Sequence, residues 1–359
     1  MGFQRITLFQ FRNLQDAEVD VNSPEVFLVG ENGQGKSNFM ESIYLLCYGS
    51  SFRTRLDGDL VRHGCKSMSI RGDYIGSAVE EVFLKIEGTT KIIQTDKKRV
   101  QDRKQLIDQM PCIVFCHDDI DFVSGTPERR RWFFNQTMSL NNPLFIDTLR
   151  QYAKVIKMRN AAIKNNEMGD LLSIYDQQAA ALGLEIQRNR GNAIDRFNET
   201  FSKLFHRVSG LPGDINIRYS PSWKNAETID QALRIMHERR KTDLLLKTST
   251  SGPHRDRMSF YLDEREFSKI ASTGQRRLMS LVLRVAQALF FTQESGKKPV
   301  LLIDDVLLEL DAQKRERFLM ELPDYEQAFF TFLPDEPYDR YKRQDTKVFD
   351  VSAGALSSV

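Results

Sequence analysis

The chain has 359 residues, of which 41% are hydrophobic and 28% are charged, an ordinary balance for a globular protein. Its 51 basic and 49 acidic side chains nearly cancel, which excludes a polycationic molecule but neither requires nor excludes nucleic acid as a partner. The most apolar helical stretch, 278–291, is interrupted by Arg284 and Gln287, so we expect no membrane-spanning segment.

Cysteine spacing gives no metal or disulfide signature. Cys47, Cys65, Cys112 and Cys116 contain no paired C-x-x-C motif. Cys112 and Cys116 lie on an expected strand, where four residues span about 13 Å, too far for one disulfide or one tetrahedral metal even with His117 beside them. The N-terminal segment also lacks the apolar core of a signal peptide. We therefore expect a reduced, cytoplasmic chain.

Strand patterns dominate the region before residue 124. The alternation of apolar and polar residues favours a partly antiparallel sheet beside a nucleotide core. The expected strands are 6–11, 17–21, 25–29, 67–74, 80–86, 91–95 and 112–115.

A phosphate-binding loop interrupts these strands. It matches G-x-x-x-x-G-K-[ST], with an apolar strand before it and a helical pattern at 38–48 after it. Glycines let backbone N–H groups face phosphate oxygens, Lys36 reaches the β- and γ-phosphates, and the Ser37 hydroxyl ligates Mg²⁺. A glycine turn that binds nothing is the structural alternative. The predicted ATP-binding residues here are Gly30, Glu31, Asn32, Gly33, Gln34, Gly35, Lys36 and Ser37.

The character of the sequence changes after Ser124, where strand patterns give way to helical ones. Two long helices are expected at 128–165 and 170–208, followed by a strand at 214–219 and a helix at 226–246. Two antiparallel helices of this length form an arm, with a compact helical subdomain as the alternative. The tail, 352–359, is expected to fray.

The C-terminal part contains two further features typical of nucleotide chemistry. An apolar strand, 300–303, ends in Asp304, which we predict holds Mg²⁺ beside Ser37, and Asp305, which we predict orients or deprotonates the attacking water. The turn 272–277 precedes a predicted helix, so its N–H groups form a second anion site or an ordinary helix cap. Three parts follow: 1–123 as the first part of an ATPase lobe, 124–250 as a helical arm and second lobe, and 251–359 completing the head.

Together these motifs resemble the RecF family of recombination and repair proteins, which belongs to the ABC-type ATPases beside the structural-maintenance-of-chromosomes group. The resemblance implies an α/β ABC-type ATPase head, a mixed sheet with helices, carrying an inserted helical arm. It extends over nearly the whole chain. The matching segments are Phe11–Asn13, Gly30–Ser37, Gly125–Arg130, Gly252–Asp256, Ser272–Arg277 and Asp304–Asp311.

The resemblance also implies residue roles. Two subunits dimerise on ATP, and the signature turn of one subunit caps the γ-phosphate held by the other. Ser37 and Asp304 are the implied ligands of Mg²⁺, Asp305 and Lys36 are the catalytic residues, and Thr331 takes roughly the place of a switch histidine. The implied nucleotide contacts outside the phosphate-binding loop are Arg12, Asn13, Ser272, Gly274 and Gln275.

Partners are likewise implied by the resemblance. They are double-stranded DNA and its junctions with single strands, bound without sequence specificity, and RecR, with RecO and RecA in the same pathway. The expected function is slow, DNA-stimulated ATP hydrolysis by an ATP-dependent homodimer that assists RecA loading at replication gaps during DNA repair, recombination and the SOS response.

Some positions depart from the family pattern. Leu308 precedes Glu309 where serine is usual, Arg257 stands where a second aspartate is commoner, and Cys116 and His117 replace a small residue and proline. The loop 309–311 crosses the dimer in the family, so these changes bear on the ATPase rate.

DNA contacts are the least defined prediction. Three short basic clusters, 97–99, 129–131 and 239–241, could contact phosphates or be solvated helix faces. Rival functions are an ABC-type transporter subunit, a P-loop metabolic kinase and a non-hydrolysing, nucleotide-gated scaffold. A transporter subunit would carry Leu-Ser-Gly-Gly-Gln, a Glu after Asp304 and a switch His, none of which is present.

Overall fold

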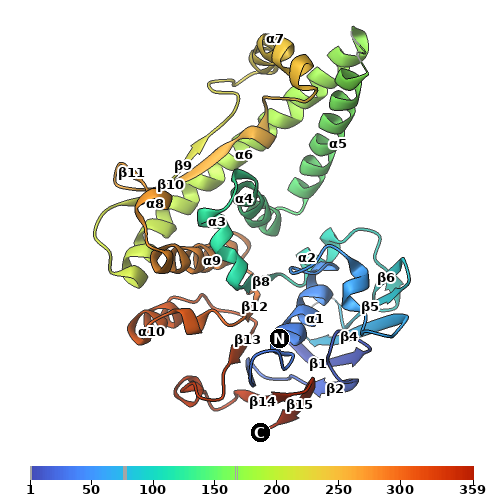
Figure 1. Ribbon diagram of the computed structural model, residues 1–359, viewed down its shortest axis with the longest axis vertical. Helices are drawn as coiled ribbons and strands as arrows, with labels where there is room; N and C mark the ends of the chain where they lie inside the picture. Colours follow the sequence, from blue (N-terminus) through green and yellow to red (C-terminus); the bar gives the residue numbers. More distant parts are fainter. Residues whose placement is uncertain (1, 76–78, 166, 168) are drawn as a thin grey trace. The chain divides into compact units, whose positions relative to one another are not determined.

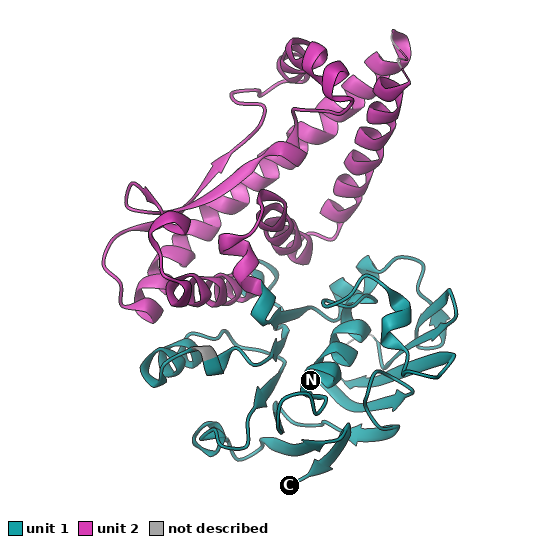
Figure 2. Ribbon diagram, in the orientation of Figure 1, with its two compact units in different colours: residues 1–118, 291–359 teal, residues 119–290 magenta. Residues whose placement is uncertain are grey.

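A computed structural model describes residues 2–75, 79–165, 167 and 169–359 (Figure 1). The chain divides into two compact units (Figure 2). Unit 1 comprises Met1–Asp118 and Phe291–Val359, and unit 2 comprises Asp119–Phe290. No helix in the described ranges combines the length and apolar character that a bilayer crossing demands.

Unit 1 contains a six-stranded antiparallel sheet in the order β2-β1-β4-β5-β6-β7. Along β4 and β5 buried and less buried residues alternate, so one face packs inward and the expected antiparallel alternation is confirmed. The strands are β1 (Gly2–Phe9), β2 (Ala17–Asp20), β4 (Ser67–Ile75), β5 (Glu81–Glu87), β6 (Thr90–Thr95) and β7 (Lys98–Arg99).

A second six-stranded sheet in unit 1 has the order β15-β14-β3-β13-β12-β8. All neighbours run parallel except β14 and β15, and the strands from β3 to β8 are wholly buried. The carboxyl ends of β3 and β12 therefore lie at one edge, on either side of β13. The strands are β3 (Glu25–Val29), β8 (Cys112–Phe115), β12 (Val300–Ile303), β13 (Gln327–Phe332), β14 (Lys347–Ser352) and β15 (Ala355–Ser358).

Shorter elements complete unit 1. The helix α1 (Lys36–Tyr48) follows β3, packs against the sheets and ends at Gly49, as expected. Two short helices are α2 (Lys104–Gln109) and α10 (Ala312–Met320), and single 3-10 turns lie at Asp57–Leu60, Leu307–Glu309 and Tyr338–Tyr341.

The C-terminal tail is ordered, so the expectation that it frays is wrong. Strands β14 and β15 form a hairpin whose turn residues, Ala353 and Gly354, have φ values of 48° and 78°. A Cβ on Gly354 would lie 2.1 Å from the carbonyl oxygen of Asn13, so only glycine fits there. The Gly354 N–H donates to the carbonyl of Gln34 at 3.0 Å. The tail is therefore held by the phosphate-binding loop, a long-range contact that local composition does not reveal.

Unit 2 is mainly helical and includes a three-stranded antiparallel sheet in the order β11-β10-β9. Its helices are α3 (Asp121–Ser124), α4 (Pro127–Asn141), α5 (Leu144–Lys164), α6 (Asp170–Ser209), α7 (Ile229–Leu246), α8 (Phe267–Ile270) and α9 (Thr273–Ser295), the last of which continues into unit 1. Its strands are β9 (Ile215–Ser220), β10 (Arg257–Leu262) and β11 (Arg265–Glu266), and a 3-10 turn spans Pro253–Arg255.

The single helix expected at 128–165 is in fact two helices. Asn142 has φ −136° and ψ 93°, and Pro143 follows it. A proline lacks the N–H that the helix needs and disfavours the helical conformation in the residue before it, so α4 stops and α5 starts anew.

The expected antiparallel helical pair is confirmed as α5 and α6, which lie side by side in Figure 1 and share an apolar core that includes Tyr152 and Leu184. A buried ionic cluster joins α7 to this pair. Arg159 contacts Asp176 at 2.6 Å and Asp243 at 2.7 Å, and all three side chains are 1% exposed. The helices of this unit are thus fixed to one another by charge as well as apolar packing.

The division of the chain differs from the expected one at both ends of unit 2. Residues 251–290 belong with the helices, because β10 pairs with β9 and buried Asp256 contacts Arg190 at 2.7 Å. The unit begins at Asp119, whose carboxylate contacts Arg284 of α9 at 2.7 Å. Local composition marked the change near 124 but not these long-range pairings.

Candidate nucleotide-binding site

The phosphate-binding loop joins β3 to α1 in the strand–loop–helix order expected from sequence. Gly35 stands immediately before the helix with φ 121°, a backbone conformation that residues other than glycine rarely adopt. A cavity of about 170 Å³ opens on this loop. It is lined by Glu31, Gly33, Gly35, Lys36, Ser37, Asn38, Arg53 and Asp305.

Lys36 is the central cation of the site. Its side chain is 3% exposed, and its ammonium donates to the carbonyls of Gly30 at 2.6 Å and Glu31 at 3.1 Å. A buried ammonium needs such partners, and phosphate oxygens are stronger ones than neutral carbonyls. The loop therefore holds this positive charge where an incoming phosphate can compete for it.

Ser37 and Asp304 meet as the sequence predicted. The Ser37 hydroxyl donates to Asp304 Oδ1 at 2.8 Å, although 267 positions separate the two residues. Asp304 is 8% exposed. Its burial, with the nearby charge of Asp305, raises its pKa to about 6. A hydroxyl and a carboxylate at this distance are the oxygen donors that Mg²⁺ prefers, and a divalent cation would restore the ionised form. These residues fit a Mg²⁺ site.

Asp305 has the left-handed φ of 55° and is held in place by Thr331 of the neighbouring strand β13. The Asp305 N–H donates to the Thr331 hydroxyl at 2.7 Å, and that hydroxyl donates to Asp305 Oδ1 at 2.8 Å. The Thr331 side chain is almost fully buried. A left-handed aspartate costs about 1–2 kcal/mol, so these two hydrogen bonds stabilise an unfavourable backbone that aims a carboxylate at the cavity.

Replacing Thr331 with valine is expected to lower kcat for ATP about tenfold while leaving ATP affinity unchanged, since valine keeps the shape but leaves the Asp305 N–H without its acceptor. Single-turnover hydrolysis and equilibrium ATP titration measure the two quantities separately. Thr331→Ser retains the hydroxyl and should behave like the unchanged protein. A valine variant with full kcat would show that this tether does not orient Asp305.

Arg12 and Asn13 support the loop rather than line the cavity. Arg12 makes a two-pronged ion pair with Glu41, and Asn13 Nδ2 donates to the carbonyl of Gly33 at 3.3 Å. Gln34 is turned to the tail, where its side-chain oxygen accepts from the Ala353 N–H at 2.7 Å. Asn32 and Gly30 are absent from the cavity lining.

Sequence reasoning missed two charged residues at this site, Glu41 and Arg53. Glu41 is an acidic residue inside an otherwise largely apolar helical stretch, which was a usable signal of a buried ion pair. Arg53 lies in a loop and carried no local signal.

The turn 272–277, the signature turn that the resemblance implies, belongs to unit 2 and leads into α9. The Ser272 hydroxyl accepts from the Gln275 N–H at 3.3 Å, and the Gln275 side chain accepts from the Ser272 N–H at 2.8 Å, a reciprocal capping box. This is the helix-cap geometry weighed as the alternative. Gly274 is exposed, and a Cβ there would meet nothing within 4 Å. The packing of this chain therefore gives no reason for a glycine at that position.

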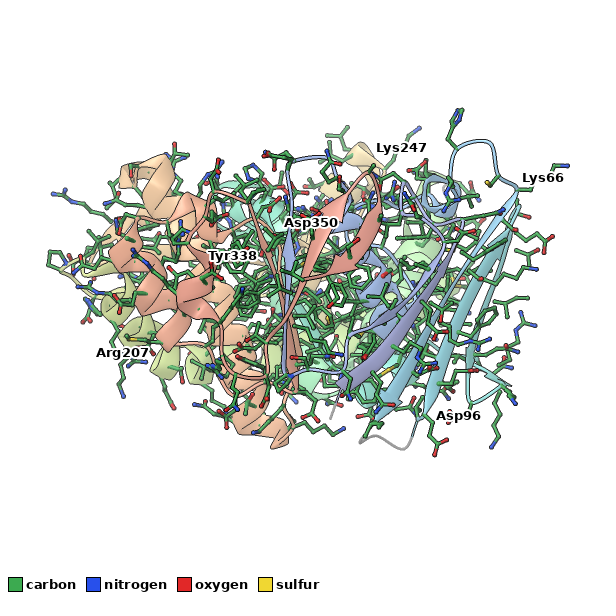
Figure 3. The ribbon with its side chains drawn as sticks, turned by 90° about the horizontal axis from the view of Figure 1, so that it is seen from below. Lys66, Asp96, Arg207, Lys247, Tyr338 and Asp350 are labelled. Carbon is green, nitrogen blue, oxygen red and sulfur yellow. The ribbon has the colours of Figure 1, made fainter. Side chains whose placement is uncertain are left out.

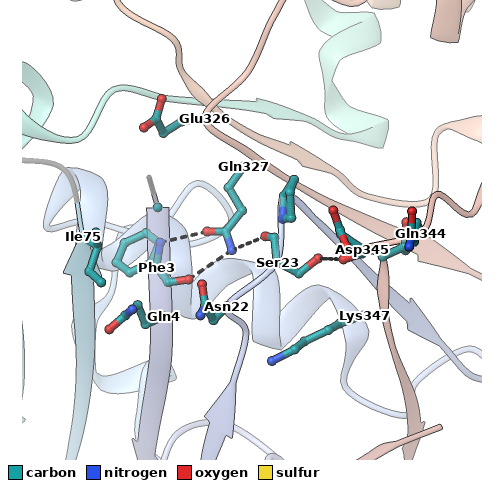
Figure 4. Close-up of a pocket in the computed structure, with 13 residues that line it drawn as sticks. Phe3, Gln4, Asn22, Ser23, Ile75, Glu326, Gln327, Gln344, Asp345 and Lys347 are labelled. Carbon is teal, nitrogen blue, oxygen red and sulfur yellow. Dashed lines mark hydrogen bonds between the residues drawn. The ribbon is translucent and has the colours of Figure 1, made fainter.

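A larger cavity of about 560 Å³ lies elsewhere in unit 1 (Figure 4). Gln327, on its wall, is 1% exposed and uses its amide on the backbone of Phe3, Val21 and Ser23. These contacts connect the two sheets and occupy the amide nitrogen of Gln327 with backbone carbonyls.

Metal sites of other kinds find no support. Within the described residues, no group of three or more His, Cys, Asp or Glu side chains could hold a metal ion, and none of the cysteines forms a disulfide. Cys116 and His117 therefore belong to no such group among the described residues.

Comparison with known proteins decides the family. The model of the RecF/RecN/SMC N terminal domain family matches residues 3–344. A DNA replication and repair protein RecF from Treponema pallidum (strain Nichols) is 45% identical over 352 residues, which cover 98% of this chain and 99% of that protein. The chain belongs to the RecF family.

Solved structures agree with this assignment. A structure described as the recombination mediator protein RecF with ATP in the RecFOR pathway superposes with a TM-score of 0.88 at 25% identity, covering 100% of this chain and 97% of that one. An Smc head domain from Pyrococcus furiosus, 14% identical with a TM-score of 0.56 and coverage of 100% and 96%, shares the fold alone. RecF-family membership confirms the predicted α/β ABC-type ATPase head and places the chain among ATPases of DNA replication and repair.

Proposed function

We propose that this chain is an ATP-gated DNA-binding protein of recombinational repair and replication-gap processing. ATP joins two copies, the closed dimer holds DNA, and slow hydrolysis stimulated by DNA releases it. The observation that carries the proposal is the meeting of Lys36, Ser37 and Asp305 at one cavity, with Asp304 hydrogen-bonded to Ser37, in a member of the RecF family. ATP with Mg²⁺ is the nucleotide this arrangement suits.

The signature turn supports dimerisation. Ser272 and Gly274 are exposed at the beginning of a 23-residue helix, whose dipole favours an anion. Because the glycine has no role in packing its own chain, a close approach by another molecule is its physical reason. Ser272, Gly274 and Gln275 would then contact, in trans, the γ-phosphate that Lys36 of the other copy binds.

Family membership also bears on the protein partners and on the alternative functions. RecR is the proposed protein partner, with RecO and RecA in the pathway, because solved relatives are described as recombination mediators of the RecFOR pathway. The transporter alternative is disfavoured, because a DNA replication and repair protein RecF is 45% identical over 98% of the chain. The tether between Thr331 and Asp305 favours hydrolysis over a scaffold without turnover, since it holds a carboxylate at the cavity.

Two measurements test the proposed function. Sedimentation velocity should show a dimer with ATP and a monomer with ADP or no nucleotide. A mobility shift with gapped duplex and ATP should be strong at low salt and weak at high salt, because the contacts go to phosphates. A dimer that ignores the nucleotide contradicts ATP gating, and no shift at low salt would favour the scaffold.

The three basic clusters proposed as DNA contacts differ in how many of their side chains already bond to other residues of the protein. Arg130 and Arg131 are half-buried and donate to the backbone carbonyls of Met258 and Asp256 at 3.1 and 2.9 Å. Arg240 is paired with Asp176. These side chains brace unit 2, and half-buried Arg129 is paired with Asp121 at 3.3 Å. The exposed members of these two clusters are therefore Arg239 and Lys241.

Residues 97–99 are exposed at the hairpin between β6 and β7. The turn is stiffened by Asp96, whose carboxylate accepts from the N–H groups of Glu80 and Glu81 at 3.0 and 2.9 Å. Figure 3 shows Asp96 and Lys66 at opposite ends of the antiparallel sheet. Three exposed basic side chains thus lie at one hairpin, Lys97 in its turn and Lys98 and Arg99 on opposite faces of β7, where each could contact a phosphate.

Changing Lys97, Lys98 and Arg99 to glutamine together is expected to weaken DNA binding and to reduce the slope of log K against log salt by about 2 to 3, since each phosphate contact contributes about 0.9. Binding titrations at several salt concentrations with ATP measure the slope. The matched control is Lys297→Gln with Lys298→Gln, because these lysines already face Asp108 and Asp324. An unchanged slope in the triple variant would rule out the hairpin as a contact.

A further inference from the structure

A fully buried carboxylate lies one helical turn beyond Ser37. Glu41 in α1 has a side chain that is 0% exposed, and it is shared by two arginines. The Arg12 Nε and Nη2 atoms each lie 2.9 Å from a different carboxylate oxygen, while Arg53 Nη1 lies 3.6 Å from Oε2. Neither ATP chemistry nor the motifs account for this acid.

The same carboxylate organises the loop that carries Arg53. The Ser51 hydroxyl donates to Glu41 Oε1 and accepts from the N–H groups of Arg53 at 2.8 Å and Thr54 at 3.0 Å. Arg53 Nη1 also donates to Asn38 Oδ1 at 2.5 Å. Hydrogen bonds therefore hold both the backbone and the guanidinium of Arg53 against α1, the helix that begins at the phosphate-binding loop.

The two arginines differ in how fully their charge is balanced. Arg12 uses both carboxylate oxygens and is 20% exposed, whereas Arg53 contacts one oxygen at longer range and is 42% exposed. Arg53 lines the same cavity as Lys36 and Ser37. One negative charge against two guanidiniums leaves a net positive charge, and it is carried on the side that faces the cavity.

We propose that Glu41 is a positioning residue for ATP binding: it anchors Arg12 and, through Ser51 and its own ion pair with Arg53, holds Arg53 where its guanidinium meets the triphosphate. This inference rests on the proposed ATP-binding function. It explains the burial of the Glu41 carboxylate by the positioning of Arg53 rather than by charge balance alone. Positioning makes the carboxylate favourable for binding an anion, although its own charge repels one.

The opposite signs of these two effects supply the test. If Glu41 only balances charge, Glu41→Gln removes a negative charge near the cavity and ATP affinity stays the same or rises. If it positions Arg53, Glu41→Gln weakens ATP affinity about tenfold in chains that have Arg53. A tenfold change in affinity corresponds to about 1.4 kcal/mol, which is within the usual coupling energy of neighbouring residues. In chains with Arg53→Ala the same change should have no further effect.

A double-mutant cycle over Glu41→Gln and Arg53→Ala, read as ATP dissociation constants from fluorescence titration at low protein concentration, measures this coupling. Arg55→Ala is the matched control, because Arg55 is exposed, lies two residues from Arg53 and is absent from the cavity lining. Additive effects, or wild-type affinity in Glu41→Gln, overturn the inference. Absence of ATP binding in the unchanged protein would instead overturn the proposed function.

Losing one partner of a buried ion pair can also unfold a protein. Urea denaturation of each variant separates that outcome. If Glu41→Gln does not fold, Ser51→Ala takes its place in the cycle, because it removes the hydroxyl that links Glu41 to the Arg53 backbone and leaves every charge intact. The expected loss is then about threefold in affinity, again only where Arg53 is present; an equal loss without Arg53 contradicts the proposal.

Discussion

Replacing Lys36 with alanine is expected to abolish measurable ATP binding and to leave the protein monomeric in the presence of ATP. The ammonium is 3% exposed and is held at the loop by two carbonyls, so it is already desolvated where a phosphate arrives. Charge-assisted hydrogen bonds of this kind contribute about 1.5–3 kcal/mol each, and the loss of two corresponds to roughly a 100-fold or larger drop in affinity.

Sedimentation velocity at saturating ATP and a direct ATP titration measure the two effects of Lys36→Ala. Lys66→Ala is the matched control, since Lys66 is an exposed lysine before β4. Urea denaturation should show a folded variant, because alanine leaves only neutral carbonyls at the loop. A Lys36→Ala protein that still dimerises on ATP would contradict the idea that the nucleotide joins the two copies.

The core of this site could be predicted because its signals are local. The strand before Gly30 and the strand before Asp304 are short apolar runs, and the carboxyl ends of such buried strands share one edge of a sheet. That rule brings Ser37 and Asp304 to the same edge, and their hydrogen bond shows that they meet there. The position of Thr331 came from resemblance, and its contact with Asp305 is visible only once β13 is placed between the other two strands.

The rest required contacts that no short window contains. The β14–β15 hairpin is ordered because Gly354 touches Asn13 and Gln34, hundreds of residues away in sequence. The boundary near 250 failed to separate the units because β10 completes a sheet with β9. By contrast, the break at Pro143 can be predicted from the local sequence, since proline cannot continue a helix, whatever the apolar periodicity on either side of it.

Replacing Asp305 with asparagine is expected to leave ATP affinity intact and to lower the hydrolysis rate about 100-fold or more, the usual contribution of a general base. Asparagine is nearly the same shape and still offers an oxygen to the Thr331 hydroxyl, so the left-handed turn should persist. What it loses is the negative charge that orients and deprotonates water. Rapid-quench hydrolysis and ATP titration separate the two effects.

The consequence for assembly is a dimer that forms on ATP but does not come apart. Sedimentation after ATP is chased with ADP should show Asp305→Asn dimers persisting long after those of the unchanged protein have dissociated. Asp335→Asn is the matched control, because Asp335 is an exposed aspartate shortly after β13. If Asp305→Asn instead loses ATP binding, the carboxylate must serve the bound ground state, as a second ligand of Mg²⁺ beside Asp304 would, and Thr331 would then be positioning a metal ligand rather than a base.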